Sequence, residues 1–85
     1  MTYKEAVTLL DMQDRNLRKV NNVRFVEDGY EYRVKYMGGF ASYIAIDRRK
    51  LGARRFNYFG GVGAYNCWNV EEAMALVMKE VKSKA

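Results

Sequence analysis

The clearest structural signal in this chain is the alternating run Tyr30-Glu31-Tyr32-Arg33-Val34-Lys35-Tyr36. Large apolar or aromatic side chains alternate with charged ones, which is the period of two that a half-buried β-strand requires. The tyrosines and Val34 fall on one side, and Glu31, Arg33 and Lys35 fall on the other. The stretch therefore predicts a sheet with one buried face and one charged, open face.

Turn signals on both sides of this stretch predict neighbouring strands. Asp28-Gly29 separates it from a β-rich run over 23–27 and favours a type I′ turn, which needs positive φ at both central residues. Gly38-Gly39 supplies a second turn, and a third strand is expected over 40–46. Short connections of this kind favour an antiparallel meander over crossover connections.

A fourth strand is expected over 54–59, after a polar loop. Its alternation places Phe56 and Tyr58 toward the core, and Arg55, Asn57 and Phe59 toward the open face. The run Gly60-Gly61-Val62-Gly63 then predicts a mobile loop, because glycine leaves the backbone unrestricted. It lacks the Gly-Lys-Ser/Thr ending of a phosphate-binding loop.

Helical patterns flank the predicted strands. Thr2 and Glu5 form a capping box, and the apolar rhythm that follows is interrupted near residue 13. Either one helix runs to about residue 19, or it breaks near residue 13 and restarts for one turn. Asn69 caps the second helix, Glu72 completes its box, and an apolar stripe continues over 70–81.

These elements predict one α+β domain over residues 1–85, in the order α-β-β-β-β-α. An antiparallel meander sheet carries the N- and C-terminal helices packed on one face. A chain of 85 residues has room for a single core, and its 49% hydrophobic composition excludes a disordered chain. One face of the sheet is then left open.

The charge of the chain is concentrated in this sheet. The net charge is +5, yet residues 32–68 contain seven basic residues and one acid, Asp47, so the rest of the chain sums to −1. A local excess of positive charge indicates an anionic partner. Aromatic residues within the same stretch suit nucleic acid, because rings stack on bases while cations neutralise phosphates.

We expect a small, basic nucleic-acid-binding domain that contacts the phosphate backbone of DNA or RNA through the open face and a basic hairpin over 48–55. Tyr43 and Phe59 are the expected stacking platforms. The alternative for the same side chains is a solvated face with no ligand. The predicted interface residues are Arg33, Lys35, Tyr43, Arg48, Arg49, Lys50, Arg54, Arg55 and Phe59.

A protein partner is the main alternative. A compact accessory or inhibitor protein of the type made by phages and mobile elements would use the positive face against an acidic protein surface, with Tyr65 and Trp68 as anchors. Trp68 by itself is more often a core residue just before a helix cap, and Tyr65 is equally suited to either role. A homodimer that buries the open face or pairs an edge strand is a third possibility.

The residue inventory argues against catalysis and cofactors. The chain has no histidine, and Cys67 alone makes neither a nucleophile–base pair nor a zinc site. No carboxylate pair or metal-ligand spacing is present, so we expect a non-enzyme without a cofactor or metal. A single cysteine and the absence of a membrane-spanning apolar run favour a cytoplasmic location.

The predicted order of elements is similar to two nucleic-acid-binding folds. A basic meander followed by a helix that begins Trp68-Asn-Val-Glu-Glu-Ala73 resembles small three-stranded-sheet DNA-binding domains, such as integrase arm-binding domains. A helix, a meander and a closing helix also resemble the double-stranded-RNA-binding domain. That family has a basic start to its last helix, where this chain has Val70, Glu71 and Glu72. Neither resemblance covers a specific motif, so no site residue is transferred.

Overall fold

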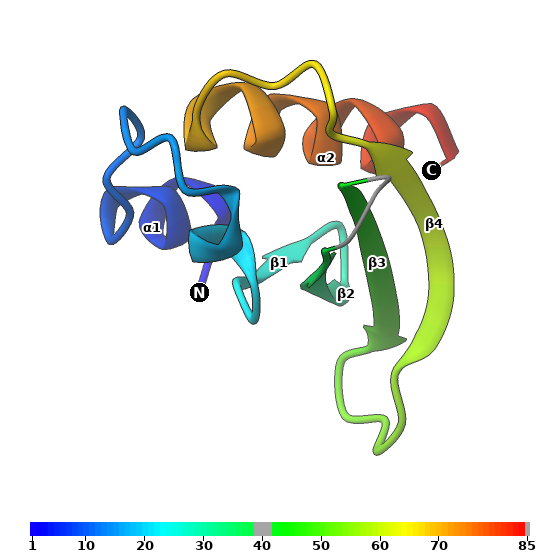
Figure 1. Cartoon of the computed structure of the whole chain (residues 1–85). Coiled ribbons are helices and arrows are strands. Elements are labelled where there is room, and N and C mark those ends of the chain that lie inside the picture. Colours follow the sequence, from blue (N-terminus) through cyan, green and yellow to red (C-terminus); the bar gives the residue numbers. More distant parts are fainter. Residues whose placement is uncertain (39–41, 85) are drawn as a thin grey trace.

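The computed structural model describes residues 1–38 and 42–84, and it confirms the predicted order of elements. Four strands form one antiparallel sheet in the order β1-β2-β3-β4, with both helices on the same side (Figure 1). The elements are α1 (Tyr3–Thr8), a short 3-10 helix η1 (Leu17–Val20), β1 (Arg24–Glu27), β2 (Tyr30–Met37), β3 (Tyr43–Lys50), β4 (Asn57–Gly63) and α2 (Val70–Lys84).

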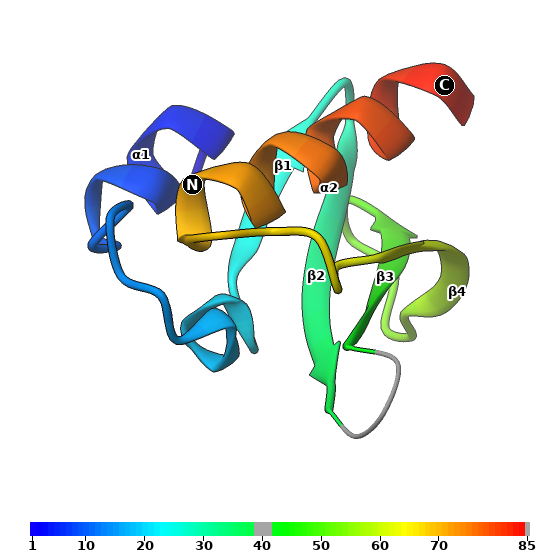
Figure 2. The ribbon, with the colours of Figure 1, turned by 45° about the horizontal axis from the view of Figure 1, so that its top comes forward.

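The core lies between α2 and the inner face of the sheet. Figure 2 shows α2 crossing in front of the strands, with α1 beside β1. The predicted apolar stripe of α2 is buried, as are the alternate residues of β2 and β3 that face it. The residues of these three elements with no exposed surface are Val34, Ile44, Ile46, Val70, Ala73, Met74 and Val77. The first two residues of the expected third strand, 40 and 41, fall outside the residues that the structure describes.

The first helical segment breaks and restarts for one turn, as the second alternative predicted, but the break begins after residue 8 and not near residue 13. Thr2 and Glu5 form the predicted capping box, but α1 ends at Thr8 and one turn restarts at Leu17. Asp11 and Asp14 favour a non-helical segment between the two helices, because their carboxylates accept hydrogen bonds from backbone N–H groups two residues later instead of leaving them for a helix.

This broken segment closes the start of α2. The N–H groups of Val70 and Glu71 donate to the carbonyls of Asp14 and Met12, at 2.8 and 3.0 Å. Asn69 Oδ1 accepts from the N–H of Glu72, as predicted for a cap. These amides therefore have internal partners and are not available to a phosphate group.

The N-terminus covers the free edge of β1. Thr2 forms a parallel bridge with Val26, whose N–H donates to the carbonyl of Met1 at 2.7 Å. The ring of Tyr3 meets the buried ring of Phe25 edge-on, with centroids 5.3 Å apart. Covering an edge in this way keeps it from pairing with another chain.

The predicted type I′ turn is confirmed, and the predicted bounds of the last two strands are wrong. Asp28 and Gly29 have φ of 50° and 82°, both positive as the turn requires. The third and fourth strands, however, lie several residues later than expected. The segment 60–63, expected as a mobile loop, belongs to β4 and pairs with β3 through Gly60, Gly61 and Gly63.

Close packing explains why glycines stand in this strand. A Cβ atom on Gly60 would lie 2.6 Å from Glu80 Oε2 and 2.8 Å from Lys84 Nζ, both on α2. The bare strand lets the end of the helix approach, and Lys84 Nζ donates to the carbonyl of Phe59 at 3.0 Å. Gly61 leaves room on the other face for the ring of Tyr43.

A bulge reverses the predicted facing of β4. The register shifts between Ile46 and Asp47, which pair with Gly60 and Tyr58 and leave Phe59 as an extra residue. Phe59 packs on the core, and Tyr58 points outward with 65% of its surface exposed. The prediction that Tyr58 is buried and Phe59 outward was therefore wrong, because the bulge puts the residues before Gly60 in the opposite phase to those after it.

Removing a core side chain tests the packing of α2 on the sheet. Ile46 is fully buried, so Ile46→Ala is expected to lower the free energy of unfolding by about 2–4 kcal/mol through lost burial and a residual cavity. Leu9 is 74% exposed, and Leu9→Ala should change it by less than about 0.5 kcal/mol. Urea unfolding followed by circular dichroism measures both, and equal effects would contradict this core.

Candidate nucleic-acid interface

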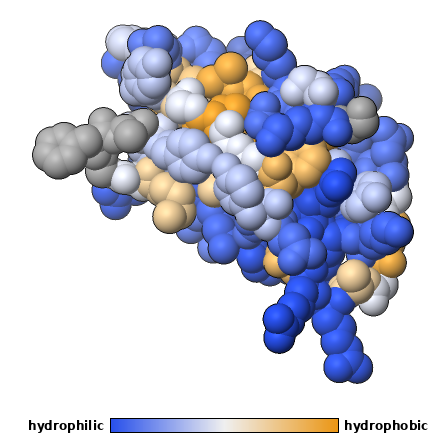
Figure 3. All heavy atoms as spheres, turned by 90° about the vertical axis from the view of Figure 1, so that its right-hand side faces the viewer, coloured by the Kyte–Doolittle hydropathy of each residue, from blue (hydrophilic) through white to orange (hydrophobic). Residues whose placement is uncertain are grey.

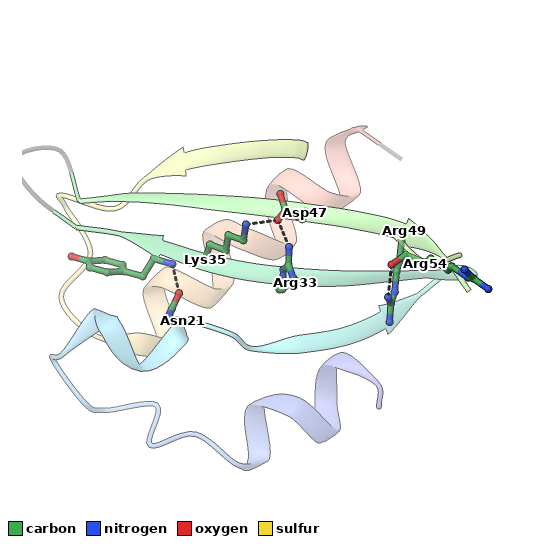
Figure 4. Close-up of polar contacts among 7 residues, drawn as sticks. Asn21, Arg33, Lys35, Asp47, Arg49 and Arg54 are labelled. Carbon is green, nitrogen blue, oxygen red and sulfur yellow. Dashed lines mark hydrogen bonds and ion pairs between the residues drawn. The ribbon is translucent and has the colours of Figure 1, made fainter. Parts of the chain in front are cut away.

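The outer face of the sheet, on the side away from α2, carries opposite charges in register. Arg33 pairs across the strands with Asp47, and Glu31 with Arg49. Arg33 Nη2 lies 2.9 Å from Asp47 Oδ2, and Arg49 Nη2 lies 2.6 Å from Glu31 Oε1. Lys35 Nζ reaches the same Asp47 oxygen at 3.1 Å (Figure 4). Two carboxylates therefore hold three of the predicted phosphate-binding cations.

Asp47 is the one buried acid of this face, with 8% of its surface exposed. Burial by itself raises the pKa of this carboxyl group. The hydrogen bonds and charges of Arg33 and Lys35 outweigh burial, so the net effect is a pKa below the ordinary 3.8. The carboxylate therefore stabilises the fold at neutral pH, and this stabilisation disappears as the pH falls through its lowered pKa.

The ring of Phe56 contacts the guanidinium groups of three arginines on the same face. Its ring centre lies 4.3 Å from the guanidinium carbons of both Arg33 and Arg49, and 5.4 Å from that of Arg24. Guanidinium groups favour the faces of aromatic rings, so the ring offsets part of their mutual repulsion. Phe56 was predicted to face the core, and its place among these arginines could not be found from alternation alone.

The connection between β3 and β4 forms a basic tip, which we define as residues 50–55. Lys50, Arg54 and Arg55 are exposed there and take part in no ion pair among the described residues. The tip projects on the side of the molecule opposite α2 (Figure 1), and Figure 3 shows hydrophilic side chains extending from that end. These three residues are the most accessible cations of the predicted interface.

Hydrogen bonds order the root of the basic tip. The guanidinium of Arg49 donates to the carbonyl of Arg54 at 3.3 Å, and the N–H of Ala53 donates to the carbonyl of Lys50 at 3.0 Å. Leu51 N–H donates to the carbonyl of Gly29, which joins the tip to the β1–β2 turn. Gly52 has a φ of 90°, a conformation that glycine adopts without strain.

Tyr43 lies on the outer face as predicted, next to the newly exposed Tyr58. Their hydroxyl groups are 2.6 Å apart, and this hydrogen bond, followed by burial, raises the pKa of Tyr43. The ring of Tyr43 lies over Gly61, as the contacts of a Cβ placed there show. Tyr43 is thus held in one position beside the edge strand.

Arg48 and Phe59 lie on the inner side and not on the predicted interface. The guanidinium carbon of Arg48 is 4.2 Å from the ring centre of Tyr30 and 4.6 Å from that of Phe59. Phe59 also meets the buried ring of Tyr32 edge-on, at 5.4 Å between centroids. The expected stacking role of Phe59 was wrong, because the β4 bulge turns this ring into the protein.

Trp68 and Tyr65 are exposed, 61% and 73% respectively, on the loop that leads from β4 to α2. The expectation that Trp68 fills the core was wrong. Its ring packs instead against the guanidinium of Arg15, at 4.2 Å. This loop leads to the start of α2, on the side of the molecule opposite the basic tip (Figure 1). One flat partner surface therefore does not contact both regions.

The outer face and the basic tip together carry the whole net charge of the chain. Glu31 and Asp47 are the acids of this surface. Seven basic and two acidic residues give it +5, so the other eight basic and eight acidic residues of the chain cancel. Asp28, in the adjoining turn, forms no ion pair with the tip among the described residues. The basic members are Arg24, Arg33, Lys35, Arg49, Lys50, Arg54 and Arg55.

Three other features of the described residues are relevant to function: the Cys67 thiol, groups of metal-ligating side chains and the apolar length of the helices. Burial, followed by the charge of Glu72, raises the pKa of the Cys67 thiol, so the thiol is protonated at neutral pH and a poor nucleophile. Within residues 1–38 and 42–84, no group of three or more carboxylate, thiol or imidazole side chains is placed to hold a metal ion. In the same part of the chain, no helix is long and apolar enough to cross a bilayer.

Comparison with known proteins adds no relative: the chain matches no protein family, and no curated protein or solved structure is detectably similar to it. The charges and contacts of the protein surface are therefore the basis for inferring a function.

Neutralising Asp47 tests the charge pairing of the outer face. Asp47→Asn is expected to lower the free energy of unfolding at pH 7 by about 1–3 kcal/mol, because Arg33 and Lys35 lose their shared carboxylate. The difference from the natural protein should shrink below pH 3.8, as its own Asp47 becomes protonated. Asp28→Asn, at an exposed turn position, is the matched control, and urea unfolding over a pH series measures all three proteins. A pH-independent difference would contradict this pairing.

Trp68→Ala tests the exposed position of the indole. It is expected to cost less than about 1 kcal/mol of stability, because most of the ring is already in water. A buried tryptophan in the same place would cost about 3–5 kcal/mol. Since Trp68 is the only tryptophan, its fluorescence should also be readily quenched by iodide in the natural protein. A shielded, blue-shifted emission would contradict this placement.

Proposed function

We propose that this protein is a small, non-enzymatic nucleic-acid-binding domain that uses the basic tip and the adjoining outer face. The observation that carries the proposal is the segregation of charge: the net +5 lies on this one surface. A phosphate backbone is attracted to such a surface, and release of its counterions supplies most of the binding free energy. A merely solvated face gives no reason for charge to collect on one side.

The cations of this surface have two different roles in the proposal. Arg33, Lys35 and Arg49 are already held by carboxylates, so their charge toward a ligand is largely compensated. They shape the face and set the position of Phe56. Phosphate contacts come mainly from the exposed cations of the basic tip, with Arg24 beside them.

Removing the tip charges tests the proposal. The double variant Arg54→Ala/Arg55→Ala is expected to bind nucleic acid at least about tenfold more weakly at low salt. The slope of log affinity against log salt should become shallower by roughly 1.5–2, because two phosphate contacts are lost. Fluorescence anisotropy with labelled DNA and RNA at about 50 and 200 mM salt measures both quantities.

Lys79→Ala/Lys82→Ala is the matched control, since it removes the same charge from exposed positions of α2. It should retain most of the affinity. Equal losses of affinity in the two double variants would show that binding depends on the overall charge of the protein and not on the basic tip. No binding of any nucleic acid at low salt would overturn the proposed function.

A protein partner is the second candidate function, and the exposure of Tyr65 and Trp68 favours it. Exposed aromatic residues next to an arginine have the composition of interface hot spots. Because this loop and the basic tip lie on different sides, an acidic partner bound at the tip leaves the fluorescence of Trp68 unchanged. A partner bound at the loop alters it, so a single emission spectrum separates the two arrangements.

A further inference from the structure

We propose that the nucleic acid bound by this protein is B-form duplex DNA, whose major groove receives the basic tip. This inference rests on the proposed function and specifies its ligand. It follows from the shape of the tip, from the positions of its cations and from the lack of free aromatic rings for stacking on the described part of the outer face.

The basic tip is the closing loop of the β3–β4 hairpin. β3 and β4 pair as far as Arg48 and Asn57, and the chain then reverses through Gly52. The paired strands that lead into this loop lie about 4.8 Å apart, and a hairpin end of this width with its side chains fits the major groove of B-DNA, which is about 12 Å wide. The deep and narrow major groove of A-form RNA does not admit it.

The tip is ordered before any ligand binds. Its root is held by the Arg49 guanidinium on the Arg54 carbonyl and by the Leu51 amide on the Gly29 carbonyl. Arg49 is itself fixed by Glu31, at 2.6 and 2.8 Å. A loop whose backbone is held at its root loses little backbone freedom on entering a groove, which lowers the entropic cost of presenting its three cations.

The cations of the tip also suit a groove. Lys50, Arg54 and Arg55 are exposed at the end of the hairpin, where the two groove walls would present phosphates on either side. Arginine additionally matches the O6 and N7 acceptors of guanine on the major-groove floor. The tip therefore meets both backbone and base edges without any change in the sheet.

The outer face is poorly suited to single strands, which need several free rings for stacking. Phe56 is covered by guanidinium groups, and Phe59 packs into the core. Tyr43 is tied to Tyr58, which is the one largely exposed ring of β4. A single exposed ring beside fixed ion pairs does not form a platform for successive bases.

Binding of matched nucleic acids to the intact protein tests the inference. Anisotropy is measured with a DNA duplex, an RNA duplex of the same sequence and the separate DNA strands, all at one salt concentration. The DNA duplex is expected to bind at least tenfold more tightly than either alternative. Equal or tighter binding of duplex RNA or single strands would overturn the inference and leave the proposed function standing, whereas no binding of any of them would overturn both.

Two further measurements locate the groove. Bulky substituents at the C5 position of pyrimidines project into the major groove and should weaken binding at least tenfold, while a minor-groove ligand such as netropsin should not compete.

Gly52→Val keeps every charge but strains the chain reversal at a φ of 90°, in a place where a side chain meets no other atoms. This variant should remain folded by circular dichroism and lose at least tenfold in duplex affinity. Unchanged affinity in Gly52→Val, or competition by netropsin, would overturn entry of the tip into the major groove.

Discussion

α2 buries one side of β2, and this burial determines how the other strands are placed and which residues reach each face of the sheet. β2 lies between β1 and β3, so the residues that it turns toward α2 fix which side of every neighbouring strand becomes inner. Val34 and Ile46 are completely buried opposite the apolar stripe of the helix. In a chain this short, such burial supplies most of the stability, and a register slip of one residue would turn these buried side chains toward solvent.

The same constraint sends the charged residues of β2 to the outer face, where they must be accommodated. The strand register places Asp47 opposite Arg33 and Glu31 opposite Arg49, so both acids of the outer face form ion pairs within the sheet. Phe56 then covers the arginines from above. Apart from Arg24, the cations of this surface that form no ion pair among the described residues lie at the basic tip, which is why most of the positive charge available to a ligand is found at the end of a hairpin.

Glycine in β4 links the two faces of the sheet. Gly60 allows the end of α2 to approach the strand, and Gly61 receives the ring of Tyr43 from the opposite side. Both approaches depend on the absence of a side chain, since a Cβ would collide with Glu80 or with the tyrosine. These glycines thus form part of a paired strand, because tertiary contacts restrict a backbone that glycine alone would leave conformationally free.

The alternation of residues 30–36, the Asp28-Gly29 turn and the stripe of α2 were sufficient to predict the meander, the order of elements and most of the core. Each of these signals is local and repeats with a fixed period. The outward positions of Arg33, Lys35 and Tyr43 followed from the same periods. Tertiary structure alone decided the bulge at Phe59, the exposure of Trp68 and the burial of Asp47. Each of these depends on which distant residue fills the space opposite, and no local period of the sequence carries that information.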